Sequence, residues 1–128
     1  MKRVQQLGRG CGVACVAMFA DVSYDVVVTK WFECNKQLKG LRTKDVIWLL
    51  KQFKMNTKGY DKLIRINLKT KVEELDSCIL KVNPRGPRGR NWHWVVWDSQ
   101  RKKILDPAYY GLQELNHYKI MSYLPVAK

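Results

Sequence analysis

A chain of 128 residues with 46% hydrophobic residues is expected to form one domain, residues 1–128, which excludes a wholly disordered protein. The formal net charge of +13 at pH 7 favours anionic partners such as nucleic acid, an acidic membrane surface or an acidic protein. A basic domain without such a partner is the alternative that composition leaves open.

The first half of the chain is predicted to be helical. Small and apolar residues over 12–20 suit a helix that is buried on every side. Ser23 is a candidate cap for a second helix that continues to Phe32. Thr43 is a candidate cap for a third helix, whose apolar stripe ends at Phe53.

The second half of the chain is predicted to be a sheet. Residues 63–68 alternate in polarity, 78–82 form a short apolar run, and 92–97 are a strong strand candidate. Residues 103–106 are expected to pair with 92–97 as a hairpin, and 120–126 to form a closing strand. Helices followed by antiparallel strands predict an α+β fold with the helices packed on one side of the sheet.

Cys11 stands between Gly10 and Gly12 at the start of the first predicted helix. A thiol at the positive end of a helix is stabilised as the thiolate, which is the nucleophilic form. The flanking glycines leave room for a substrate carbonyl beside the sulfur. A small buried cysteine is the alternative, and for Cys15, one turn further on, burial is the preferred interpretation.

His93 is the candidate base, and two acids are candidates to orient it. Period two along the strand places His93 on the face opposite Asp98. Asp106 ends the neighbouring strand of the hairpin, which brings it alongside His93, so Asp106 is preferred. A core histidine with a satisfied hydrogen bond is the alternative interpretation.

Gln5 and Gln6 are candidate donors to an oxyanion, since a side-chain amide and a backbone amide together form such a hole. A glutamine pair near a terminus is more often solvated surface. The spacing to Cys11 favours Gln5.

These residues, taken in order, resemble the C39-like branch of the papain-like cysteine peptidases. That family shows a glutamine six residues before the nucleophile, a Cys-Gly-x-Ala helix start, a His-x-Val-Val strand and a later Asp-Pro. The corresponding segments here are Gln5, Cys11-Gly12-Val13-Ala14, His93-Trp94-Val95-Val96 and Asp106-Pro107. Gly10 departs from the acidic or polar residue that many members have before the nucleophile.

The resemblance implies a papain-like fold and a role for each matched residue. It implies Cys11 as nucleophile, His93 as general base and acid, Asp106 as the residue that orients His93, and Gln5 as oxyanion donor. We therefore expect a cysteine peptidase that hydrolyses a peptide or isopeptide bond. Deamidation or acyl transfer on the same triad remains open, and so does a basic nucleic-acid-binding protein without catalysis.

A basic loop leads directly into His93. Arg85, Arg88 and Arg90 lie among prolines and glycines, and we expect them to help capture an acidic protein or peptide substrate, with Trp94 beside them. A nucleic-acid contact and a plain hairpin connection are the alternatives.

No metal site and no cofactor are predicted, because Cys11 and Cys15 lack further ligands at the spacing of a zinc site. The 4 cysteines are scattered rather than arranged as a disulfide framework. Lys2 and Arg3 before an apolar run resemble a signal peptide only faintly, so the expected location is the cytoplasm. The longest apolar run is far shorter than a membrane span.

Overall fold

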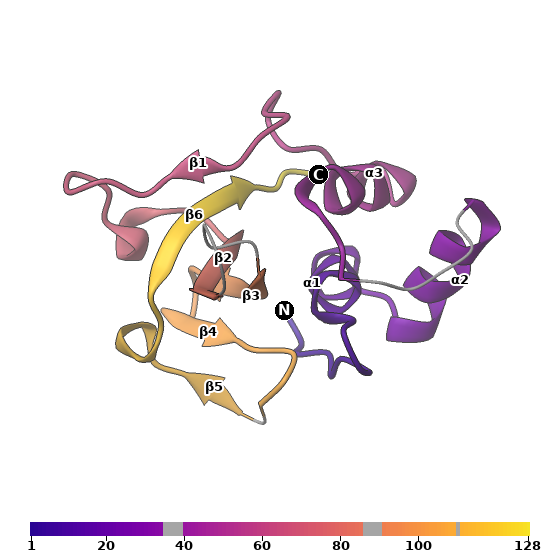
Figure 1. Ribbon diagram of the computed structural model, residues 1–128, viewed down its shortest axis with the longest axis horizontal. Helices are drawn as coiled ribbons and strands as arrows, with labels where there is room; N and C mark the ends of the chain where they lie inside the picture. The colour runs from indigo at the N-terminus through magenta and orange to yellow at the C-terminus, as the bar shows by residue number, and fades with distance from the viewer. Residues whose placement is uncertain (35–39, 86–90, 110) are drawn as a thin grey trace.

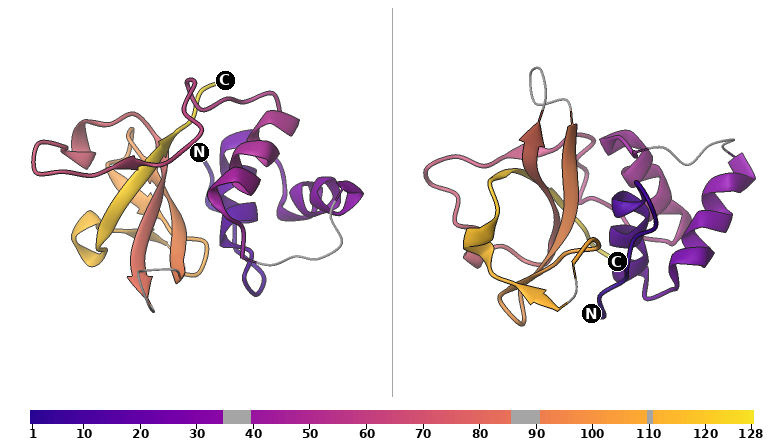
Figure 2. Two further views of the ribbon diagram at one scale, coloured as in Figure 1. Left: turned by 45° about the horizontal axis from the view of Figure 1, so that its top comes forward. Right: turned by 60° about the horizontal axis from the view of Figure 1, so that its bottom comes forward.

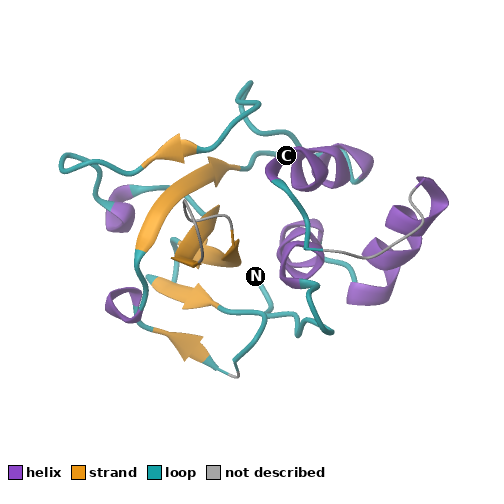
Figure 3. Cartoon of the chain, viewed as in Figure 1, coloured by secondary structure: helices purple, strands orange, loops and turns teal. Residues whose placement is uncertain are grey.

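The structure is a computed structural model that describes residues 1–34, 40–85, 91–109 and 111–128 (Figure 1). The helices come first in the chain: α1 (Cys11–Ala20), α2 (Tyr24–Cys34) and α3 (Thr43–Gln52). The strands follow them: β1 (Ile64–Arg65), β2 (Cys78–Arg85), β3 (Asn91–Asp98), β4 (Lys103–Leu105), β5 (Leu112–Gln113) and β6 (Ile120–Pro125). Short 3-10 helices, η1 (Val72–Glu74) and η3 (Leu115–His117), lie between strands. The fold is α+β, as predicted, with helices and strands in separate halves of the chain (Figure 3).

α1 is the central helix of the helical layer. Its small and apolar side chains are buried from Cys11 to Met18. It ends at Asp21, which adopts a left-handed conformation with φ of 56° and donates its backbone N–H to the Ala17 carbonyl. Figure 1 shows α1 between the sheet and the other two helices, which confirms the prediction of a helix buried on every side.

The two other helices differ in how they are capped. The Ser23 hydroxyl accepts the Val26 N–H at 3.3 Å, which confirms the predicted cap of α2. The predicted cap of α3 at Thr43 is wrong, because Arg42 occupies the N-cap position. The Asp45 carboxylate accepts the Arg42 N–H at 2.9 Å and takes over the role of capping group.

The strands form one antiparallel sheet in the order β1-β6-β2-β3-β4-β5. The predicted hairpin of β3 and β4 is confirmed, with pairs from Val96–Leu105 to Asp98–Lys103. The closing strand β6 lies inside the sheet, between β1 and β2. β5 was not predicted, and the alternating segment 63–68 contributes only the two residues of β1.

Two apolar clusters cover the two faces of the sheet. Trp94 and Val96 of β3 pack against the helices, whereas Val95 and Trp97 pack on the opposite face with Leu80. This alternation confirms the predicted faces of β3. Both views in Figure 2 show the three helices on one side of the sheet, as expected.

Within the described part of the chain, we find no single helix with the length and apolar composition needed to cross a membrane. α1 and α2 meet that criterion only when taken together, and they are bent by 115° where they join.

Candidate active site

Cys11 is the first residue of α1, as predicted, and only 8% of its surface is exposed. Gly10 precedes it at the N-cap position and supplies no side-chain cap to the helix. The first backbone N–H groups of α1 therefore have no partner within the helix, and they lie beside the thiol. The positive end of the helix dipole thus lies beside the sulfur.

The flanking glycines are required by close packing. A Cβ at Gly10 would lie 1.8 Å from the Tyr24 hydroxyl oxygen. A Cβ at Gly12 would lie 3.1 Å from the Leu41 Cβ and 3.3 Å from the Trp94 ring. The two glycines thus allow Tyr24, Leu41 and Trp94 to approach the start of α1 directly.

His93 lies near the start of β3, beyond the segment of β3 that pairs with β4. Its side chain is 23% exposed, and its Nε2–H donates to Oδ1 of Asp106 at 2.7 Å. The Cys11 thiol lies within hydrogen-bonding reach of the same ring. Since Nε2 is used by Asp106, Nδ1 is the nitrogen available to Cys11.

Burial alone would lower the pKa of His93, but its hydrogen bonds to Asp106 and Cys11, together with their charges, raise it to about 9. His93 is therefore protonated at neutral pH in this environment. The site therefore places a cationic imidazole beside the Cys11 sulfur.

Asp106 is the fully buried acid of the site, with 0% exposure. Its carboxylate also accepts the Tyr118 hydroxyl at 2.6 Å and the Ala108 N–H at 2.8 Å. Burial raises the pKa of Asp106, but the hydrogen bonds from His93, Tyr118 and Ala108 and the charge of His93 bring it below its ordinary value. Asp106 thus remains ionised and holds the His93 ring from one side.

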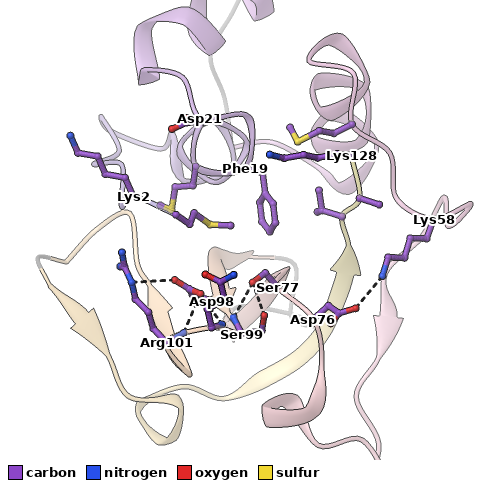
Figure 4. A pocket seen from close by; sticks show the side chains of 16 residues that line it. Lys2, Phe19, Asp21, Lys58, Asp76, Ser77, Asp98, Ser99, Arg101 and Lys128 are labelled. Atoms are coloured by element: carbon purple, nitrogen blue, oxygen red, sulfur yellow. Dashed lines mark hydrogen bonds and ion pairs between the residues drawn. The ribbon is translucent and has the colours of Figure 1, made fainter.

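The preference for Asp106 over Asp98 agrees with this geometry. Asp98 lies at the other end of β3, accepts the Gln100 N–H at 3.1 Å and pairs with Arg101 at 3.6 Å. It lines a separate cavity of about 790 Å³ at that end of the sheet (Figure 4). The residues lining that cavity do not include Cys11 or His93.

The cleft beside the thiol consists of two adjoining cavities. One, of about 470 Å³, is lined by Cys11, and the other, of about 290 Å³, is lined by Asp106. Both are lined by the residues Gln6, Asn91, Trp92 and His93. Space for a substrate therefore extends to both sides of His93.

The structure places Gln6 in the cleft and Gln5 outside its lining, contrary to the preference for Gln5. The Gln6 N–H donates to the Pro107 carbonyl at 2.9 Å, which ties this segment to the loop after β4. The exposed Gln5 side chain accepts a hydrogen bond from Arg3 instead. The Gln6 side-chain amide donates to the Gly8 carbonyl at 2.6 Å and keeps a second N–H.

Trp94, predicted to bind substrate, is 1% exposed, and its indole N–H donates to the Leu41 carbonyl at 2.9 Å. It supports the floor of the cleft, while half-buried Trp92 packs edge to face on it at 5.8 Å. Arg85 is the last residue of β2, and Arg88 and Arg90 lie outside the described residues.

Sequence reasoning missed Tyr118, which belongs to the segment between η3 and β6. Nothing in its local sequence distinguishes it from a surface tyrosine. Only the fold brings its hydroxyl to Asp106.

In the described part of the chain, no group of three or more histidine, cysteine, aspartate or glutamate side chains is arranged to hold a metal ion. All 4 cysteines of the sequence are free thiols, and Cys34 is the exposed one. Comparison of the chain with models of protein families, with curated proteins and with solved structures gave no match.

Proposed function

We propose that the protein is a papain-like cysteine peptidase of C39-like type, which hydrolyses a peptide or isopeptide bond. The observation that carries the proposal is the relay from Asp106 through His93 to Cys11, with 2.7 Å between the first two. A thiol, an imidazole and a buried carboxylate in this order are the groups that thiol-dependent acyl transfer uses.

In the proposed reaction, the Cys11 thiolate attacks the substrate carbonyl carbon, and the carbonyl π electrons move onto the oxygen. The Cys11 N–H and the free N–H of the Gln6 side chain stabilise that oxyanion. The carbon–nitrogen bond then breaks as His93 gives its Nδ1 proton to the leaving nitrogen, which leaves a thioester on Cys11.

Neutral His93 next takes a proton from water, whose oxygen attacks the thioester. The carbon–sulfur bond breaks, and the thiolate and protonated His93 are restored. Asp106 keeps its charge throughout and fixes the ring so that Nδ1 faces the sulfur. Transfer to an amine in place of water follows the same steps.

The test is intact-protein mass spectrometry after treatment with iodoacetamide at neutral pH. Burial raises the pKa of the Cys15 thiol, and burial followed by the charge of Asp76 raises that of Cys78 to about 12, so both react slowly. A Cys34→Ser background removes the exposed thiol. We expect Cys11 to be modified first.

His93→Ala is expected to slow alkylation of Cys11 by about tenfold or more, because the thiolate loses its cationic partner. His117→Ala is the matched control, since His117 is an exposed histidine of η3. If Cys11 reacted as slowly as Cys15, or as fast in the His93 variant as in the parent, the proposed function would be wrong.

A further inference from the structure

The two halves of the cleft differ in charge. The half that contains Cys11 is lined by Arg9 and Arg42, and its described lining residues include no carboxylate. The half beyond His93 is lined by no lysine or arginine among the described residues, and its one acid, Asp106, is already engaged. Among the described residues, the arginines of the cleft therefore lie in the half that contains Cys11.

Both arginines are available to a ligand. Arg9 is exposed, and no carboxylate pairs with it in the described part of the structure. The Arg42 side chain is 69% exposed and lies 3.7 Å from the Asp45 carboxylate. An ion pair with so exposed a side chain contributes little free energy. Since Asp45 already accepts the Arg42 backbone N–H, it competes only in part for the Arg42 guanidinium.

A third cation, Lys81, lies against Trp92, which lines both halves of the cleft. The Lys81 ammonium lies 4.3 Å from the ring centroid of Trp92. It adds positive potential to the cleft while the aromatic ring presents an apolar surface.

The chemistry of the site sets the direction in which a substrate lies. His93 gives the proton on Nδ1, which faces the sulfur, so the bond that breaks lies between the Cys11 sulfur and this nitrogen. The acyl portion becomes bonded to Cys11 and occupies the half that contains Arg9 and Arg42.

We propose, on the basis of the proposed function, that the substrate carries a carboxylate side chain in its acyl portion, within two residues of the bond that Cys11 attacks. Arg9 and Arg42 reach it from two sides, one from the segment before α1 and one from the start of α3. Guanidinium groups bind carboxylates through paired hydrogen bonds, which a neutral amide side chain cannot match.

The experiment uses tripeptide chloromethyl ketones with glutamate, glutamine or lysine at each of the two residues nearest the electrophile. The rate of Cys11 alkylation is measured by intact mass in the Cys34→Ser protein. We expect a glutamate probe to react about five- to tenfold faster than its glutamine counterpart, and the lysine probe to react slowest. This preference should weaken as salt is raised.

The preference should be lost in the Arg9→Gln/Arg42→Gln double variant and kept in Arg65→Gln, which removes one exposed charge on β1. Equal rates for glutamate and glutamine, or a preference that survives in the double variant, would overturn the acidic specificity. Iodoacetamide serves as the neutral probe in every variant. If it selects Cys11 while the peptide probes show no preference, only this inference fails; if it does not select Cys11, the proposed function fails.

Discussion

Asp106 is the residue on which the geometry of the site most depends. It is fully buried, and its carboxylate accepts hydrogen bonds from His93, Tyr118 and Ala108. Its backbone carbonyl accepts a further hydrogen bond from the Arg3 side chain at 2.6 Å. Each hydrogen bond to the carboxylate offsets part of the cost of burying its charge.

Tyr118→Phe removes one donor from this carboxylate and changes little else in volume. We expect the free energy of unfolding at pH 7 to fall by about 1–3 kcal/mol, the usual range for a hydrogen bond to a charged group. Urea unfolding checks this value, and the rate of iodoacetamide alkylation at Cys11 should fall as His93 loses its fixed orientation. Tyr123→Phe is the control, because the Tyr123 hydroxyl makes no hydrogen bond within the described residues.

The same variant has an expected pH dependence. Because the folded-state pKa of Asp106 is lowered, its contribution to stability is present above the ordinary aspartate pKa and is lost as pH falls through the folded value. Tyr118→Phe reduces that contribution, so the gap in stability between parent and variant should narrow below about pH 4. A gap that stays constant at low pH would show that Tyr118 acts by packing alone.

The two glutamines provide an internal comparison. Gln6→Ala is expected to slow alkylation of Cys11 by a peptide chloromethyl ketone about 100-fold, because one donor to the oxyanion is lost. Gln5→Ala should leave this rate unchanged. Iodoacetamide, which develops no oxyanion, should react equally with both variants, and the reverse ranking of the two glutamines would refute the assignment.

At the scale of single residues, the sequence predicts those site residues whose partners lie close to them in one hairpin. Asp106 is predictable because β3 and β4 are adjacent in the chain, so strand alternation alone separates it from Asp98. Gln6 is not predictable from spacing, since its placement depends on a hydrogen bond to the Pro107 carbonyl. Tyr118 is not predictable either, because its hydrogen bond to Asp106 also depends on the tertiary fold.

Among the elements, α1 depends most on a single residue, the glycine before the thiol. Gly10→Ala places a Cβ 1.8 Å from the Tyr24 hydroxyl oxygen and 2.9 Å from the Leu7 carbonyl oxygen. We expect a loss of about 3 kcal/mol in the free energy of unfolding, measured by urea titration, because a tightly packed site must shift.

Gly40→Ala is the control, because no atom lies within 4 Å of its added Cβ and its φ is not positive. The double variant Gly10→Ala/Tyr24→Phe should recover part of the loss, since it removes the contact with the Tyr24 hydroxyl oxygen, the closer of the two. A Gly10 variant as stable as the Gly40 variant would rule out this account of the helix start.

Helix positions follow from the sequence more closely than strand positions. The small and apolar pattern of α1 and the Ser23 cap of α2 are local signals, and both are confirmed. The cap of α3 was misassigned because Asp45 competes with Thr43 for the same role. The position of β6 between β1 and β2 depends on pairing over long distances, which no local pattern encodes.

At the scale of the whole molecule, the charge of +13 gives nonspecific attraction to polyanions. We expect a single-stranded oligonucleotide to bind weakly and without sequence preference at low salt, with a Kd that rises steeply as salt is added. Fluorescence anisotropy measures this, and Cys11→Ser should not change it. Tight, sequence-dependent binding at about 200 mM salt would favour a nucleic-acid-binding function over the peptidase.

β6 lies inside the sheet although it is the last strand in the chain. Asp106 and Arg3, which a hydrogen bond joins beside the site, are separated by 103 positions in the chain. The sheet reaches its final strand order only after β6 has left the ribosome and inserted between β1 and β2. The proposed proteolytic activity therefore depends on the completed sheet, and we expect a chain whose β6 has not yet paired to lack it.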